Sequence, residues 1–140
     1  MIEIRTLGAQ DIDPLLAVPV GLFDEDIMPD QSLAFLTGNL HILLLAFDGD
    51  LAVGMPTATV LLHPDKPPAL FVNELGTRES HMRRGIATDL MQRMIDLGRA
   101  RGCQGIWLGT EPDNAAALGL YRKLGGDEEI FIGFGWDEAL

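Results

Sequence analysis

Cysteine is nearly absent from this sequence, in which Cys103 is the single example among 140 residues. One cysteine cannot form an internal disulfide, and we interpret it as structural or incidental rather than catalytic, because it falls in an expected turn between a helix and a strand. Histidine is also scarce, and the three residues His41, His63 and His81 show no spacing typical of metal ligands. The sequence therefore predicts no metal.

Positive charge is the next deficit, with 10 Lys and Arg residues against 21 Asp and Glu residues and a net charge of −11. Nucleic acid is an improbable partner for such a chain, because phosphate binding requires a basic surface. A negative field favours a cationic substrate by steering it toward the protein. The alternative is that the acidic residues serve solubility alone.

The sequence has no hydrophobic run long enough for a transmembrane helix, and residues 1–5 lack the apolar core of a signal peptide. We therefore expect no membrane association and a cytoplasmic protein. Linkers, repeats and low-complexity segments are absent as well. At 140 residues, 47% hydrophobic and 22% charged, the chain has the length and composition of a soluble globular domain.

Apolar periodicity and turn signals predict an α/β (α+β) arrangement. The expected strands cover residues 2–7, 41–47, 51–62, 69–77, 105–110 and 129–136. The expected helices cover residues 11–19, 29–38 and 85–101, and a last one opens at residues 112–114.

The stretch 81–88 lies between a β-prone run and a helix and predicts an anion-binding turn. At a helix N-terminus the first N–H groups lack partners and the dipole is positive, so the main chain itself holds a phosphate. Gly85 permits close approach of the phosphate, and Arg83 and Arg84 add positive charge. The alternative is an ordinary strand–turn–helix with solvated arginines.

A second motif extends from Asn114 to Gly125. Together the two motifs resemble the GNAT superfamily of N-acetyltransferases, whose coenzyme A loop reads Gln/Arg-x-x-Gly-x-Gly/Ala and whose later helix reads Asn-x-x-Ala-x-x-Leu-Tyr-x-x-x-Gly-Phe. The departures are Met82 at the first loop position and Gly126 in place of Phe. The matching residues are Arg84, Gly85, Ile86, Ala87, Asn114, Ala117, Leu120, Tyr121 and Gly125.

The resemblance implies one GNAT domain over residues 1–140, with a mixed central sheet of about six strands flanked by about four helices. The implied order is strand–helix–helix–strand–strand–strand–helix–strand–helix–strand. It also implies acetyl-CoA as the donor and a homodimer with the final strand as a plausible interface.

The resemblance further implies which residues bind the donor. Backbone groups of the strand before the loop contact the pantetheine arm and the acetyl carbonyl, the loop holds the pyrophosphate, and Asn114 bonds the pantetheine arm. Met82 removes one polar side chain from this set without removing the backbone donors. The implied residues are Leu75, Gly76, Thr77, Met82, Arg83, Arg84, Gly85, Ile86, Ala87, Thr88, Asn114 and Tyr121.

Acetyl transfer to an amine requires a neutral amine, a polarised carbonyl and a protonated leaving thiolate. Tyr121, the only tyrosine, matches the family residue that protonates the thiolate, and its alternative role is packing on the apolar stripe of its helix. Asn114 caps that helix by sequence logic alone.

Glu74, on the strand before the loop, is the candidate base or cation ligand. On the opposite strand face it would instead be a structural acid paired with an arginine. Glu111 and Asp113 are rival bases. The acids Asp24, Glu25 and Asp26 form either a wall of an amine-binding cleft or a solvated loop with apolar anchors.

A further combination consists of Leu-Phe followed by acids at residues 22–26, Leu-Thr-Gly-Asn-Leu at 36–40, Glu-Leu-Gly-Thr at 74–77 and His-x-Arg-Arg-Gly-Ile-Ala-Thr at 81–88. This combination resembles the small aminoglycoside 3-N-acetyltransferases of the gentamicin-resistance type, which have Asp at the position of Glu74. Such substrates are polycations, in agreement with the acidic balance. Other small amines, polyamines and protein or peptide amines remain alternatives. An acetyl-CoA-binding sensor or interaction module is the alternative from a different class.

Overall fold

The computed structural model describes residues 1–140, which divide into two compact units, Met1–Gly109 and Thr110–Leu140. The first unit contains the whole sheet and three of the four α-helices. The second contains the fourth helix and the C-terminal segment. The fold is the mixed α/β arrangement that the sequence predicts.

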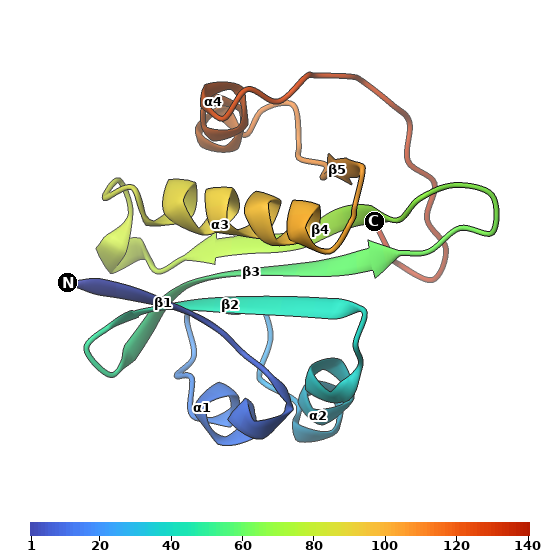
Figure 1. Ribbon diagram of the computed structural model, residues 1–140. Helices are drawn as coiled ribbons and strands as arrows, with labels where there is room; N and C mark the ends of the chain where they lie inside the picture. The colour runs from blue at the N-terminus through green and yellow to red at the C-terminus, as the bar shows by residue number, and fades with distance from the viewer. The chain divides into compact units, whose positions relative to one another are not determined.

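The first unit is built on one five-stranded sheet of order β1-β2-β3-β4-β5 (Figure 1). The first three strand pairs are antiparallel, whereas β4 and β5 are parallel. A parallel pair needs a crossover connection, which the helix between β4 and β5 provides. The strands are β1 (Ile2–Thr6), β2 (His41–Asp48), β3 (Leu51–Leu61), β4 (Ala69–Thr77) and β5 (Gly105–Trp107).

Helices cover both faces of this sheet: α1 (Ile12–Leu16) and α2 (Pro29–Thr37) lie on one face and α3 (Ile86–Ala100) on the other (Figure 1). Short 3₁₀ turns, Ala9–Asp11 and Glu79–His81, precede α1 and follow β4. With helices on both faces, β2 and most of β3 are buried from both sides, and this explains their nearly continuous apolar sequences.

The core beneath α1 and α2 joins residues of these helices and their connecting loop to one face of β2 and β3. Each of its members is at most 9% exposed. Burial of so many large side chains is the main stabilising contribution in a domain of this size. The members are Leu7, Leu15, Val18, Leu22, Leu36, Leu43, Leu45, Phe47, Ala52 and Met55.

On the other face, α3 is seated through the buried stripe of Ile86, Leu90 and Met94. Gly54 of β3 lies directly beneath it, since a Cβ there would stand 2.8 Å from Leu90 Cδ1 and 3.0 Å from Ile86 Cγ2. The missing side chain therefore lets the first turns of α3 approach the sheet closely.

In the second unit, α4 (Ala115–Lys123) has a defined start and end. The Ala117 N–H donates to Asn114 Oδ1 at 3.1 Å, so the predicted cap is confirmed. At the other end Gly125, at φ +84°, donates to the Arg122 carbonyl, and the Gly126 N–H donates to the Tyr121 carbonyl, each at 3.0 Å. This pair of bonds is a Schellman motif, which gives the motif glycine Gly125 a structural role.

The sixth strand predicted at residues 129–136 is wrong, because these residues form no strand. Gly133 and Gly135 interrupt the apolar run and weaken any strand there. Several of its side chains are largely exposed, including Ile130 at 97% and Ile132 at 81%. The strand predicted at 105–110 is also shorter, ending at Trp107.

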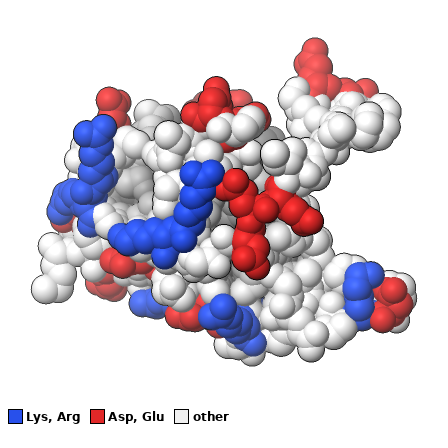
Figure 2. All heavy atoms as spheres, turned by 90° about the horizontal axis from the view of Figure 1, so that it is seen from above, with Lys and Arg blue, Asp and Glu red and all other residues white.

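Surface charge is mixed on the face drawn in Figure 2, where acidic and basic side chains both occur and neither sign covers the whole face. Several basic side chains lie toward the side on which α3 begins in Figure 1. The net charge of −11 is therefore not a uniform acidic field over this face.

No helix combines the length and the apolar character that crossing a membrane requires.

Candidate functional site

The N-terminus of α3 is open, as an anion-binding turn requires. Gly85 is the N-cap with φ +80°, and no side chain caps the helix. The first intrahelical bond runs from the Asp89 N–H to the Gly85 carbonyl at 3.0 Å. The N–H groups of residues 86–88 therefore lack a helical partner and, with the helix dipole, favour a bound anion.

The loop before this helix end is strained and exposed. Arg83 has φ +62°, a conformation that costs a residue with a side chain of order 1–2 kcal/mol. Arg83, Arg84 and Gly85 are exposed, and Met82 is 53% exposed, whereas Ile86 is buried at 3%. Both arginines are thus available to an anion at the start of α3.

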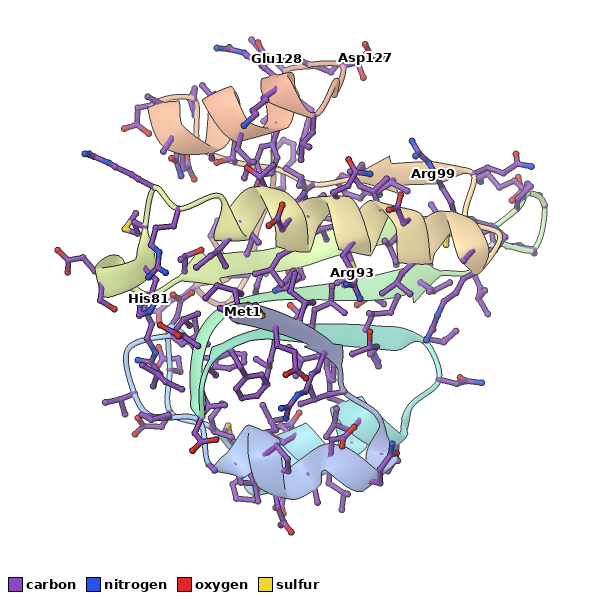
Figure 3. The ribbon with its side chains drawn as sticks, turned by 60° about the vertical axis from the view of Figure 1, so that its left-hand side comes forward. Met1, His81, Arg93, Arg99, Asp127 and Glu128 are labelled. Atoms are coloured by element: carbon purple, nitrogen blue, oxygen red, sulfur yellow. The ribbon has the colours of Figure 1, made fainter.

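His81 fixes the other end of this loop (Figure 3). Its Nε2 lies 2.8 Å from Asp48 Oδ2, at the end of β2, and its Nδ1 lies 2.7 Å from Ser80 Oγ. The hydrogen bond to His81 is the largest cause that lowers the pKa of the Asp48 carboxyl below its ordinary value, with smaller contributions from the N-terminus and Arg84. The sequence analysis missed this pair, since 33 positions separate its members.

Asp48→Asn tests the anchoring role of this pair. The aspartate pKa is lowered in the folded state, so its stabilisation is present above the unfolded value of about 3.9 and is lost as pH falls through the folded value. We expect Asp48→Asn to lower the midpoint of urea unfolding at pH 7 and to differ less from wild type below about pH 4. A difference that does not change with pH would contradict this assignment.

Glu74 lies on the face of β4 that is opposite to α3. Thr57 pairs with Glu74 but the next β3 residue, Ala58, pairs with Val72, so Asn73 is an extra residue that forms a β-bulge. The bulge changes the alternation and turns Glu74 to the same side as Phe71. Of the two faces that the sequence left open, Glu74 therefore occupies the one that looks toward α1 and α2.

Thr57, which the sequence analysis did not single out, holds the Glu74 carboxylate. Its hydroxyl donates to Glu74 Oε2 at 2.6 Å, and Thr57 is only 5% exposed. The expected alternative of a structural pair with an arginine is not found, because the partner is a neutral hydroxyl. A half-buried carboxylate in this position can bind a cation or accept a proton.

Gly76 is on the same face as Glu74 and has the loop between α1 and α2 directly above it. A Cβ at Gly76 would lie 3.3 Å from the Leu22 carbonyl oxygen and 3.7 Å from Met55 Cε. Leu75 and Thr77 alternate to the opposite face, where Thr77 pairs with Gly54 beneath α3. The strand therefore presents backbone at Gly76 to the side that carries Glu74.

The acidic residues Asp24, Glu25 and Asp26 are exposed on this same loop. Leu22 is buried in the core, and Phe23 and Ile27 pack partly buried against it. The loop thus has the apolar anchors of one of the two alternatives left open by the sequence, the solvated loop, and its acids are exposed. These acids follow Leu22, whose carbonyl lies over Gly76, on the face of β4 that also carries Glu74.

Tyr121 lies on α4 in the second unit, and burial raises the pKa of its hydroxyl above the ordinary value. The phenol is therefore protonated at neutral pH, as a proton donor must be. Glu111 and Asp113 precede this helix, and both are exposed. The Asn114 N–H donates to the Glu111 carbonyl at 3.1 Å, so this turn is ordered by main-chain contacts.

No group of three or more His, Cys, Asp or Glu residues is arranged to hold a metal ion.

Comparison with known proteins gives a family match over most of the chain. The model of the family described as "Acetyltransferase (GNAT) family" matches residues 11–126. This match includes strand β4, the loop before α3 and the whole of α4.

Two curated proteins show sequence similarity over 81 residues. N-alpha-acetyltransferase 30 from Schizosaccharomyces pombe is 33% identical, with 58% of this chain and 54% of that protein covered. L-2,4-diaminobutyric acid acetyltransferase from Shouchella clausii is 31% identical, with 58% of this chain and 44% of that protein covered. The matched part of the chain thus spans about half the length of these relatives.

Among solved structures, an aminoglycoside acetyltransferase from an uncultured soil metagenomic sample, in complex with sisomicin, has a very similar fold. The TM-score is 0.86 over 96% of this chain and 95% of that chain, with 17% sequence identity. At this identity the similarity establishes the fold alone.

Proposed function

Because the chain belongs to the acetyltransferase (GNAT) family, we propose that it transfers an acetyl group from acetyl-CoA to a primary amine of a cationic small molecule. The observation that carries the proposal is the uncapped N-terminus of α3, with Gly85 at φ +80° and two exposed arginines before it. Such a helix end accepts the pyrophosphate of the donor without a metal.

The proposed donor site follows β4 into α3. The loop residues bind the pyrophosphate through backbone N–H groups and the two arginine side chains, whereas β4 binds the pantetheine arm and the acetyl carbonyl through its backbone. Asn114 contributes to the arm in addition to capping α4. The proposed set is Leu75, Gly76, Thr77, Met82, Arg83, Arg84, Gly85, Ile86, Ala87, Thr88, Asn114 and Tyr121.

In the proposed reaction the amine nitrogen bonds to the acetyl carbon and the carbon–sulfur bond breaks. Glu74 takes the first proton that the ammonium substrate must lose, directly or through a water, and Tyr121 gives a proton to the departing sulfur. The nitrogen loses its second proton as the amide forms, and this proton restores the neutral Tyr121 hydroxyl, directly or through solvent. The support is the Glu74 carboxylate fixed by Thr57 and the raised pKa of Tyr121. Positioning of the two substrates supplies the remaining acceleration.

We propose that residues 1–140 serve this reaction as one catalytic domain, since the family match crosses the boundary between the two units.

For the acceptor we propose an aminoglycoside, modified at its 3-amino group. The support is the acidic loop of Asp24, Glu25 and Asp26 near Glu74, with Glu111 as a further candidate contact, because a polycation is attracted by several carboxylates. The sisomicin-bound aminoglycoside acetyltransferase has the same fold. Alternative acceptors are an alpha-amino group, because one relative is an N-alpha-acetyltransferase, and a diamino acid, because the other is an L-2,4-diaminobutyric acid acetyltransferase.

The deciding experiment measures thiol release from acetyl-CoA with gentamicin-like aminoglycosides, polyamines, diamino acids and short peptides. Acetylation of an aminoglycoside at the 3-amino group, located by NMR of the product, would support the narrow proposal. Turnover of another class of amine would identify that class, in place of aminoglycosides, as the acceptor. Acetyl-CoA binding without turnover of any amine would favour a sensor or interaction module.

The Thr57→Val variant tests whether the hydrogen bond from Thr57 to the Glu74 carboxylate contributes to turnover. Loss of one hydrogen bond to Glu74 is expected to lower kcat roughly threefold to tenfold, which corresponds to the usual contribution of such a bond. Thr57→Ser keeps the hydroxyl and should restore most of the rate. In a Glu74→Gln background the same Thr57→Val change should have almost no further effect, because both changes act on one interaction. An equal loss in both backgrounds would argue for a purely structural role of Thr57.

We also propose that the protein forms a homodimer through residues 129–136 and acts in the cytoplasm, where acetyl-CoA is available. The support for the interface is the exposed apolar character of the segment, including Phe134 at 79% and Trp136 at 76%. Sedimentation of the full chain beside a Phe134→Ser/Trp136→Ser variant measures this directly. A wild-type monomer at micromolar concentration would exclude the dimer.

A further inference from the structure

The loop between α1 and α2 has few polar attachments to the rest of its unit. It extends from the end of α1 at Leu16 to the start of α2 at Pro29 and contains no helix or strand. Leu22 anchors it in the core, and Phe23 and Ile27 pack beside that residue. Apolar contacts alone are not directional, so they leave the path of the exposed backbone undetermined.

The side chain of Arg78, the first residue after β4, makes the directional hydrogen bonds that hold this backbone. Its Nη2 donates to the Pro19 carbonyl and its Nη1 to the Val20 carbonyl, each at 2.7 Å. Its Nε donates to the Ala52 carbonyl of β3, also at 2.7 Å. Residues 19–27 make no other hydrogen bond, so one planar guanidinium joins this loop to the sheet.

The backbone around Arg78 leaves little space for a different arrangement. Gly21 has φ +104°, and a Cβ on it would lie 2.9 Å from Arg78 Nη1. The Arg78 N–H itself donates to the Val53 carbonyl at 2.8 Å, which fixes the point from which the side chain extends. The loop conformation and the guanidinium are therefore fitted to each other.

The consequence of this clamp lies a few residues further along the loop. After Gly21 the chain passes over Gly76, with the Leu22 carbonyl next to the position of a Cβ, and then carries Asp24, Glu25 and Asp26. Gly76 is on the face of β4 that also carries Glu74. The clamp thus determines where the three acids lie relative to that carboxylate.

We propose that Arg78 is a positioning residue that sets the affinity for the amine substrate by fixing the 17–28 loop against β4. This inference rests on the proposed acetyltransferase function. We assign Arg78 no contact with the substrate, because each of its three guanidinium nitrogens donates to a main-chain carbonyl and its positive charge repels a cationic amine. The donor loop of Arg83 to Gly85 lies outside these contacts, so we expect the main effect of Arg78 on the acceptor side.

The test compares Arg78→Met with Arg101→Met in the full chain. Arg101 is a matched control, since its Nη1 also donates to a main-chain carbonyl, that of Asn39, at 3.0 Å, in a different connection. For Arg78→Met we expect the KM of the amine to rise by at least about tenfold while the KM of acetyl-CoA stays within about twofold of wild type, because displaced binding groups lose affinity steeply. Arg101→Met should leave both KM values unchanged. Added guanidinium at low millimolar concentration should partly restore the amine KM in an Arg78→Ala variant.

Hydrogen–deuterium exchange and coenzyme A titration separate this inference from the proposed function. We expect faster exchange at residues 19–28 in Arg78→Met and an unchanged dissociation constant for coenzyme A. These results would support the clamp even if no amine were turned over, in which case the proposed function alone would fail. Equal rises in both KM values, or exchange at residues 19–28 identical to wild type, would overturn the positioning role.

Discussion

Replacement of Tyr121 by phenylalanine is expected to lower kcat about 10²-fold, the lower limit of what a general acid usually contributes. The change removes only the hydroxyl and keeps the half-buried ring on α4. Because burial raises the pKa of this hydroxyl, it carries its proton throughout the neutral range and can give it to the thiolate. The KM of acetyl-CoA should change little, since the loss is confined to the transition state.

The neighbouring Arg122→Gln provides the control for this prediction. Arg122 is exposed, lies on the same helix and pairs with Glu128 at 2.8 Å, so its replacement should leave kcat unchanged. Thermal unfolding should be nearly the same for Tyr121→Phe and wild type, because no hydrogen bond of the hydroxyl is lost. A kcat above about half of the wild-type value would assign Tyr121 to packing and would leave protonation of the sulfur to water.

Gly85→Asp is expected to raise the dissociation constant of coenzyme A by at least about 10²-fold, through repulsion between the new carboxylate and the pyrophosphate. A Cβ at Gly85 meets no atom within 4 Å, so the side chain can be accommodated. Aspartate is a favourable residue at an N-cap and tolerates a positive φ better than most residues. The helix should therefore persist while the anion site is lost. Isothermal titration with coenzyme A measures the effect.

Gly85→Asn is the matched control, because it has almost the same shape and backbone tolerance without the charge. Its affinity for coenzyme A should fall by less than about tenfold, since the backbone N–H groups and dipole remain. If both variants bound equally weakly, close approach of the ligand to Gly85 would be the determining factor. If both bound as tightly as wild type, the anion site would not be at the start of α3.

The sequence predicted the elements of the first unit well because their signals are local. Strand β4 covers the predicted range 69–77, and β2 and β3, both predicted, are joined by the turn Asp48-Gly49-Asp50, in which Gly49 has φ +62°. The stripe of Ile86, Leu90 and Met94 placed α3 within one residue of its observed start. In each case a few neighbouring residues carry the whole signal.

The features that escaped prediction depend on contacts between distant residues. The face of Glu74 is set by the bulge at Asn73, which alternation in a single strand does not reveal. The positive φ of Arg83 and the contact of His81 with Asp48 have no local signature. Arg78, which reaches back 59 positions to Pro19, could not be distinguished from any other arginine next to a loop.

At residues 129–136 the error is the reverse, since the local sequence predicted a strand that the structure does not contain. The large apolar side chains there have high β-propensity, but a strand also requires a partner for its backbone groups. Local sequence cannot provide that partner, and Gly133 and Gly135 lower the intrinsic preference further. The apolar side chains of this segment therefore favoured a strand, but the segment forms none.

The absence of a Cβ at Gly54 influences how closely the first turns of α3 lie against the sheet. Gly54 lies on β3 under Leu90 and Ile86, and a Cβ there would require either these two side chains or the first turns of α3 to shift. In the second case the N–H groups of that helix end would move with the helix. During evolutionary drift, we expect a larger residue at Gly54 to be accepted only together with a smaller residue at Leu90 or Ile86. Residues 54, 86 and 90 should then vary together, so that their total side-chain volume stays nearly constant.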